Sequence, residues 1–149
     1  MRTWTATTTV DAPPEAVLDV LTDPGACARW APVDFDVDGV DRRGRLVAGS
    51  RPRVRGRLAG VEVGFDVEVL EADGGRLALR AAGPVALDVA YDLERAEDGS
   101  SEVRASVGVQ PGRGIRGRIL AEATSALLSA GALHQALSRI GRECAAVSC

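Results

Sequence analysis

The order of hydrophobic and polar residues divides the chain into three parts. Residues 2–10 form an alternating run rich in β-branched side chains, which is typical of a strand. Residues 34–109 continue this two-residue alternation in short runs, most of them separated by glycine-containing turns. From about Ile115 to about Ala145 the apolar residues recur at the spacing of a helix. The pattern therefore predicts an antiparallel meander followed by one long C-terminal helix.

Two short helices are expected between the first strand and the meander. Pro13 and Pro14 suit the first turn of a helix, and Asp23-Pro24 suits the start of a second helix that ends near Trp30. No linker or repeat divides the chain, so residues 1–149 are expected to form a single domain. The strands predicted within the meander are residues 34–37, 46–58, 61–71, 76–81, 85–93 and 103–109.

Charged residues occupy one face of the predicted sheet. When the strands are folded at their turns, arginines fall opposite acidic residues, which is typical of cross-strand pairs on a solvated face. Only Glu94 and Glu102 bring like charges together. The Arg-rich run 51–57 is therefore interpreted as part of a charge ladder, with an anion- or nucleic-acid-binding patch as the alternative. The expected pairs are Arg57–Glu62, Arg53–Asp66, Arg51–Glu68, Glu68–Arg80, Arg80–Asp88, Arg76–Asp92 and Asp92–Arg104.

The opposite face of the sheet is almost wholly aliphatic, and the long helix is expected to cover it. Tyr91 is its only residue with a polar side-chain atom. His134, the single histidine, falls on the apolar side of the helix together with Leu127 and Leu137, and Ile119 is expected on that side too. Tyr91 and His134 are the candidate acid/base or oxyanion-stabilising pair, although a histidine at such a position is more often structural.

Composition excludes several classes of protein. Aromatic residues make up 3% of the chain and the net charge is −3, which disfavours nucleic-acid binding. All 18 basic residues are arginine, which excludes Schiff-base lysine chemistry. No metal-ligand cluster stands out, and neither a metal nor another cofactor is expected. The 3 cysteines and the lack of a signal peptide favour a cytoplasmic protein, and no apolar run is long enough to span a membrane.

The stretch GRGIRG, residues 112–117, has the glycine spacing of a dinucleotide-binding turn. Such a turn needs a following strand with an acidic residue about 20 positions later, whereas here the helix is the last element. The glycines are therefore interpreted as a flexible corner before the helix. Arg113, Arg116 and Arg118 are unfavourable at a helix N-terminus, so an acidic neighbour or an anionic partner is expected beside them.

The order of elements resembles the START-like SRPBCC superfamily, and most closely its polyketide cyclase/dehydrase branch. The resemblance rests on VDAPPEAVLDVLTDPGACARWAP (residues 10–32), GSRPRVRGRL (residues 49–58) and the closing amphipathic helix. It implies an α+β helix-grip fold, in which a curved antiparallel sheet of about seven strands wraps around the C-terminal helix. It also implies an apolar cavity between sheet and helix, and such motifs specify the fold better than the function.

Three functions follow from this resemblance as hypotheses. The first is binding of a polyketide- or lipid-like molecule, and the second is a cyclase or dehydrase that uses Tyr91 and His134. The third is a regulatory or co-chaperone-like partner without a ligand. An acyl carrier protein is a candidate partner for the arginines near residue 116, and a second copy could pair with an Arg-rich edge strand. The residues expected to line the cavity are Trp30, Phe65, Val67, Leu79, Leu87, Val89, Leu127, Ala130, Gly131 and Leu137.

Overall fold

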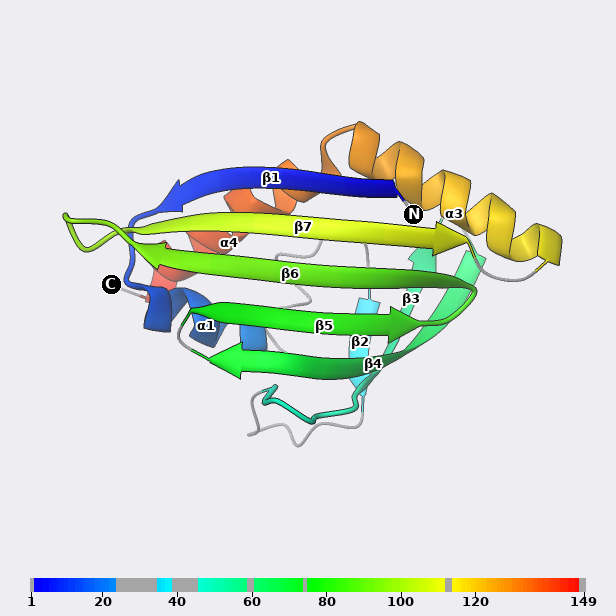
Figure 1. Ribbon diagram of the computed structural model, residues 1–149, viewed down its shortest axis with the longest axis horizontal. Coiled ribbons are helices and arrows are strands. Elements are labelled where there is room, and N and C mark those ends of the chain that lie inside the picture. The colour runs from blue at the N-terminus through cyan, green and yellow to red at the C-terminus, as the bar shows by residue number, and fades with distance from the viewer. Residues whose placement is uncertain are drawn as a thin grey trace.

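The computed structural model of the chain describes residues 2–23, 35–38, 46–58, 61–73, 75–111 and 114–147. Its strands form one seven-stranded antiparallel sheet with the order β1-β7-β6-β5-β4-β3-β2 (Figure 1). The strands are β1 (Arg2–Val10), β2 (Phe35–Asp38), β3 (Arg53–Leu58), β4 (Val61–Asp73), β5 (Arg76–Ala82), β6 (Val85–Arg95) and β7 (Ser101–Pro111). The helices are α1 (Pro14–Thr22), α3 (Gly114–Ser129) and α4 (Ala132–Val147).

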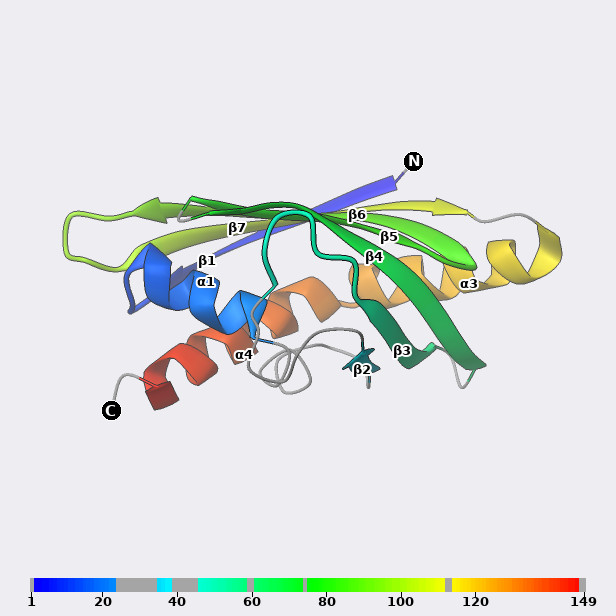
Figure 2. The same cartoon turned by 90° about the horizontal axis from the view of Figure 1, so that it is seen from below.

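The helices lie together on one side of the sheet, and the sheet curves over them (Figure 2). This arrangement confirms the predicted α+β helix-grip fold. The aliphatic face of the strands points toward the helices, and Val103 and Ala105 of β7 are fully buried there. Leu137 and Ile140 of α4 are buried against this face, and burying each such side chain stabilises the fold by about 1.5–3 kcal/mol.

Helix α1 follows β1 after a tight turn and is fixed at its start. Pro14 occupies its first turn, where the missing N–H costs nothing. The guanidinium of Arg95 on β6 donates from Nη2 to both carboxylate oxygens of Glu15, at 2.7 and 2.9 Å. A hydrogen bond from its own backbone N–H, and then Arg95, lower the pKa of Glu15. The second helix predicted near residues 23–30 falls almost wholly outside the described residues.

The single C-terminal helix that the sequence predicts is two helices in the structure. Helix α3 ends at Ser129 and α4 begins at Ala132, with Gly131 between them at a φ of 96°. The Gly131 N–H donates to the Leu128 carbonyl at 3.1 Å, which closes the last turn of α3. A glycine in the left-handed region is a common helix terminator because it carries no Cβ.

This break changes which residues of the helices face the sheet. Helix α3 buries Leu120, which is 1% exposed, together with small and hydroxyl-bearing residues such as Thr124. Ile119 is 61% exposed and Leu127 is 37% exposed, so the prediction that they face the core was wrong. The expected face assumed one continuous helix, whereas the glycine interrupts the helical phase.

The predicted charge ladder is confirmed across β3 to β7. The strand register places opposite charges face to face at Arg57 and Glu62, Arg53 and Asp66, Glu68 and Arg80, Arg80 and Asp88, Arg76 and Asp92, and Asp92 and Arg104. Arg53 Nε lies 3.3 Å from Asp66 Oδ1, and Arg80 Nε lies 3.1 Å from Asp88 Oδ1. These pairs are exposed, so each contributes at most about 1 kcal/mol to stability.

The segment before β3 differs from its prediction. β3 begins only at Arg53, because Val47 and Ser50 close a turn through a 2.9 Å backbone hydrogen bond. The chain before Arg53 still follows β4, because the N–H groups of Val67 and Val69 donate to the carbonyls of Pro52 and Ser50 at 3.0 and 2.9 Å, and this places Arg51 opposite Glu68 as predicted. β3 also pairs with both β2 and β4, so the Arg-rich strand is not the edge strand that the sequence suggested.

Candidate functional site

The inner face of the sheet keeps an apolar patch that the helices leave partly open. Leu79 on β5 lies directly opposite Val89 on β6, and Leu87 lies two residues before Val89 on the same face. All three side chains are only half-buried, although they lie on interior strands. Their neighbours Val69 and Leu77 are fully buried. The patch is therefore apolar surface that lies near the core and remains accessible to a ligand.

Phe65 on β4 extends this patch toward β3. It lies opposite Val54 in the strand register, and both side chains are half-buried. An open pocket of about 690 Å³ is lined by Arg53, Val54, Arg55, Gly64, Phe65 and Asp66. Strand alternation places the side chains of Arg53, Arg55 and Asp66 on the solvated face and those of Val54 and Phe65 on the inner face, so the charged groups do not face the apolar patch.

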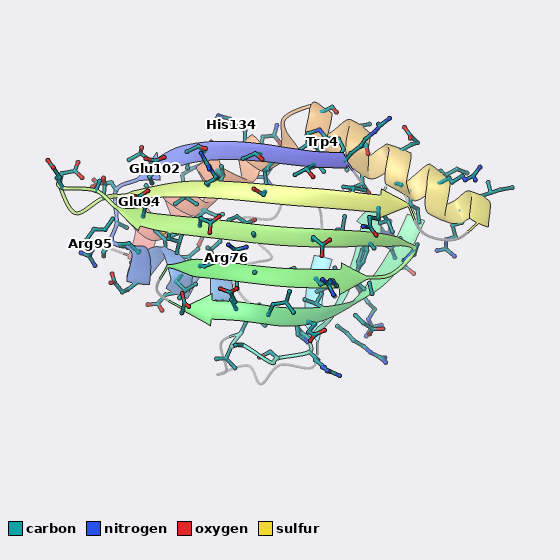
Figure 3. All side chains as sticks on the ribbon, viewed as in Figure 1. Trp4, Arg76, Glu94, Arg95, Glu102 and His134 are labelled. Atoms are coloured by element: carbon teal, nitrogen blue, oxygen red, sulfur yellow. The ribbon has the colours of Figure 1, made fainter. Side chains whose placement is uncertain are left out.

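The two candidate acid/base residues have different surroundings. Tyr91 lies on the inner face of β6, is 4% exposed and belongs to the main core cluster. His134 lies on α4 and is exposed, beside the β1 edge of the sheet (Figure 3). The prediction that His134 faces the core was wrong, because α4 buries Leu133, Leu137 and Ile140 instead. The structure therefore does not bring the two side chains together in a shared buried cavity.

The other predicted lining residues divide into three groups. Phe65, Leu79, Leu87 and Val89 form the half-buried patch described above, whereas Val67 and Leu137 are buried in the core. Leu127 and Ala130 are exposed at the end of α3, and Gly131 forms the break between the helices. These three were expected inside because of the assumed continuous helix. Trp30 falls outside the described residues.

A family model for polyketide cyclase / dehydrase and lipid transport proteins matches residues 1–143. The chain belongs to this family. The match spans nearly the whole sequence and agrees with the order of strands and helices described above. Membership supports a hydrophobic ligand or a polyketide-related function. No curated protein sequence is similar enough to the chain to count as a relative.

Solved structures share the fold of this family at low sequence identity. A protein of Thermus thermophilus is 17% identical with a TM-score of 0.71, covering 99% of this chain and 100% of the other. A START superfamily protein of Mycobacterium smegmatis is 17% identical with a TM-score of 0.67, covering 94% of this chain and 97% of the other. DynU16, from the dynemicin biosynthetic locus, is 21% identical with a TM-score of 0.58, covering 94% of this chain and 46% of the other. These similarities establish the START-like fold.

Within this family fold, sequence reasoning missed the contact that supports the aromatic side of the patch. Gly83 lies in the turn between β5 and β6, directly beside Phe65 on the neighbouring strand. A Cβ atom at Gly83 would lie 2.8 Å from Phe65 Cδ1, which is too close for any other residue to fit without a shift. The Gly83-Pro84 dipeptide signals a turn, but it gives no indication of the aromatic ring beside it.

Of the arginines near the start of α3, Arg116 has a backbone hydrogen-bond partner. Arg116 Nη2 donates to the carbonyl oxygen of Glu62 on β4 at 3.2 Å, and Arg118 is exposed. Gly114 begins α3 with a φ of 80°, a conformation that glycine adopts without strain. Helix α4 and not a strand follows α3, so the dinucleotide-binding reading of GRGIRG has no support. Arg113 lies outside the described residues.

No helix among the described residues is both long and apolar enough to cross a membrane.

Proposed function

We propose that the protein binds a hydrophobic small molecule, of polyketide or lipid type, between the sheet and the C-terminal helices. The half-buried patch of Leu79, Leu87 and Val89 carries this proposal. Interior positions of a sheet that faces helices are normally buried completely, as Val69 and Leu77 are. A ligand that covers the patch would remove apolar surface from water at about 25 cal/mol per Å².

Phe65 extends the surface on which such a ligand would lie. Its ring is on the inner face with the aliphatic patch, whereas Arg53 and Arg55 project from the solvated face of the same strand pair. The apolar body of a ligand would lie over Phe65 and the aliphatic patch, and its polar end would remain toward solvent. Polyketide intermediates and fatty acids both have an apolar body of this kind.

Thermal melting in the presence of candidate ligands tests the proposal. A ligand that binds only the folded state raises its stability, by about 2.7 kcal/mol at a concentration roughly a hundredfold above Kd. Aromatic polyketides, fatty acids and sterols form the test panel, and we expect at least one class to raise the Tm in proportion to the logarithm of its concentration. A Tm that stays constant throughout the panel would contradict the proposal and favour a ligand-free regulatory role.

A cyclase or dehydrase activity is the second proposal, and the family description favours it. Tyr91 is the polar side chain that the inner face offers to a bound substrate, and its hydroxyl could donate a hydrogen bond to a carbonyl that becomes an enolate. His134 is exposed on α4, so it could act only on a part of the substrate that reaches the surface. Turnover of a polyketide substrate would distinguish this proposal from binding alone.

Delivery of the substrate by an acyl carrier protein belongs to the same proposal. Carrier proteins are generally acidic, and Arg116 and Arg118 lie in the first turns of α3. Reversing both charges is expected to weaken binding of an acidic carrier, whereas reversing the exposed Arg142 on α4 serves as the control. Equal affinities of the two variants would rule out this docking surface.

A further inference from the structure

Strand β1 forms one edge of the sheet and pairs only with β7. Its nine residues run straight along β7 without a bulge, from Arg2 opposite Val109 to Val10 opposite Ser101. Every second backbone group of β1 therefore points away from the sheet, and within the described part of the chain no other strand receives these groups. A long unpaired edge of this kind is a template for another strand.

The sequence of β1 lacks the features that usually protect such an edge. Between Thr3 and Val10 it contains no charged residue and no proline. The opposite edge differs, because β2 is only four residues long and contains Asp36 and Asp38. The exposed outer face of β1 is formed by threonines alone, at positions 3, 5, 7 and 9. β-branched residues favour strand pairing, so the composition promotes addition of a strand.

We propose that β1 pairs antiparallel with β1 of a second copy of this chain, which joins the two sheets into one. The pattern of β1 is complementary to itself around Ala6. When Ala6 faces Ala6 of the other copy, Thr3 faces Thr9 and Thr5 faces Thr7 on the outer face. Such threonine pairs contribute favourably across strands, and a symmetric contact requires this kind of self-complementarity.

Charge supports the same register. In this arrangement Arg2 of one copy faces Val10 of the other, and Asp11 is the next residue along that chain. An exposed arginine and an exposed aspartate thus meet at each end of the contact, by symmetry. A parallel arrangement would instead bring the two Arg2 side chains together. The opposite charges therefore favour the antiparallel pair.

The contact would place the helices of both copies on one side of the joined sheet. They all lie on the inner side of the sheet (Figure 2), so a twofold axis perpendicular to the sheet keeps both helical layers on the same side. Helix α4 packs against the inner face of β1 and leaves the outer threonines exposed. His134 lies at this edge (Figure 3) and would face the second copy. Because the contact is small for a protein interface, we expect a dimer that dissociates on dilution.

The test compares the mass of the full-length chain in solution with that of a variant in which Thr5→Lys and Thr7→Lys are combined. In the proposed register each new lysine faces a lysine of the other copy, and like charges directly opposite each other destabilise a strand pair. Light scattering from micromolar to millimolar protein should show that the wild type doubles its mass and that the lysine variant does not. The control combines Val47→Lys and Leu70→Lys, which add the same charge at exposed positions away from β1, and it should still form dimers.

A second variant tests the register and guards against simple misfolding. Thr5→Glu combined with Thr7→Glu should be monomeric alone but should form a mixed dimer with the lysine variant, because opposite charges then face each other. Melting curves of the dilute variants establish that each is folded. A wild type that is monomeric at every concentration overturns the proposal, as does a dimer that persists in the lysine variant. Failure of the two folded charge variants to associate overturns the register. These outcomes do not depend on whether a small molecule binds inside the fold.

Discussion

The aromatic ring of Phe65 lies against the backbone of Gly83. A Cβ atom at position 83 would be 2.8 Å from Cδ1 of the ring and 2.6 Å from the carbonyl oxygen of Gly64. The glycine therefore lets the turn between β5 and β6 approach β4 closely, and it fixes where the ring lies. Since Phe65 lies on the inner face beside the apolar patch, the backbone at Gly83 helps to shape the proposed ligand site.

Substitution of Gly83 by alanine should disturb both the fold and the site. The new methyl group can fit only if the strand backbone shifts, and such overpacking typically costs about 1–3 kcal/mol. The matched control is Gly64→Ala, because a Cβ at Gly64 would meet nothing within 4 Å. Chemical denaturation should show the loss of stability for Gly83→Ala alone. Equal stabilities of the two variants would contradict the close contact.

A substitution at Val89 should lower the affinity for a ligand more than it lowers the stability of the fold. The Val89 side chain is half-buried in the centre of the apolar patch. In Val89→Gln the amide group of the new side chain can therefore stay partly in water. We expect the variant to lose at least tenfold in affinity for a hydrophobic ligand, which corresponds to about 1.4 kcal/mol. Val47→Gln, at a site that is 58% exposed, is the control and should bind normally. Titration calorimetry of both variants measures the difference.

Tyr91 and His134 should differ sharply if the protein is an enzyme. Tyr91→Phe removes only the hydroxyl, and it is expected to lower kcat by a factor of about 10² if that group stabilises a developing oxyanion. His134→Ala should leave kcat nearly unchanged, because the imidazole is exposed on α4. Turnover of a polyketide substrate by both variants provides the measurement. A large loss for His134→Ala together with full activity for Tyr91→Phe would reverse this assignment.

The sequence predicted the sheet well because the two-residue alternation determines which side chains share a face. A shift by one residue would have placed Arg80 and Asp88 in the core, so the register follows from the pattern and the turns. The structure accordingly confirmed the ladder strand by strand, including the like-charge contact of Glu94 and Glu102. Arg51 keeps this register although it precedes the first residue of β3, because Val67 and Val69 donate to the carbonyls on either side of it.

The candidate site was harder to predict because it depends on how separate elements meet. The alternation shows that Leu79 and Leu77 face inward, but it cannot show that the helices cover Leu77 and leave Leu79 half-open. The misplacement of His134 has a local cause. Ala130-Gly131 ends α3, and a glycine after a helical run is a recognised signal for the end of a helix. The helical spacing of the apolar residues continues past this glycine, so the sequence pattern was interpreted as one helix.

The facing pair Glu94 and Glu102 offers a simple gain in stability. Both side chains are exposed near one end of β6 and β7 (Figure 3), and they repel each other. Glu102→Arg should therefore raise stability by about 0.2–1 kcal/mol, and the gain should shrink at high salt. Asp88→Arg makes the same exchange opposite Arg80 and should lower stability instead. Thermal melting at low and high salt checks both signs, and an increase for both variants would exclude a pairwise charge effect.

Cys144 should make the fold less stable at alkaline pH. Its thiol is buried in α4, and this burial, followed by the nearby charge of Glu143, raises its pKa from 9.0 to about 11. In the unfolded chain the thiol loses its proton first, so the unfolded state gains stability as the pH rises above 9.0. The contribution of Cys144 is therefore complete below pH 9.0 and is lost progressively up to about pH 11.

Replacement of Cys144 by alanine isolates this effect. The variant loses a small buried side chain, and its stability near neutral pH should fall by about 1 kcal/mol. Its stability should then decline less steeply than that of the wild type above pH 9.0, by a difference of at most about 3 kcal/mol, since one pKa unit corresponds to about 1.4 kcal/mol. Urea denaturation at a series of alkaline pH values measures both slopes. Parallel slopes for the two proteins would show that Cys144 titrates no differently in the folded state.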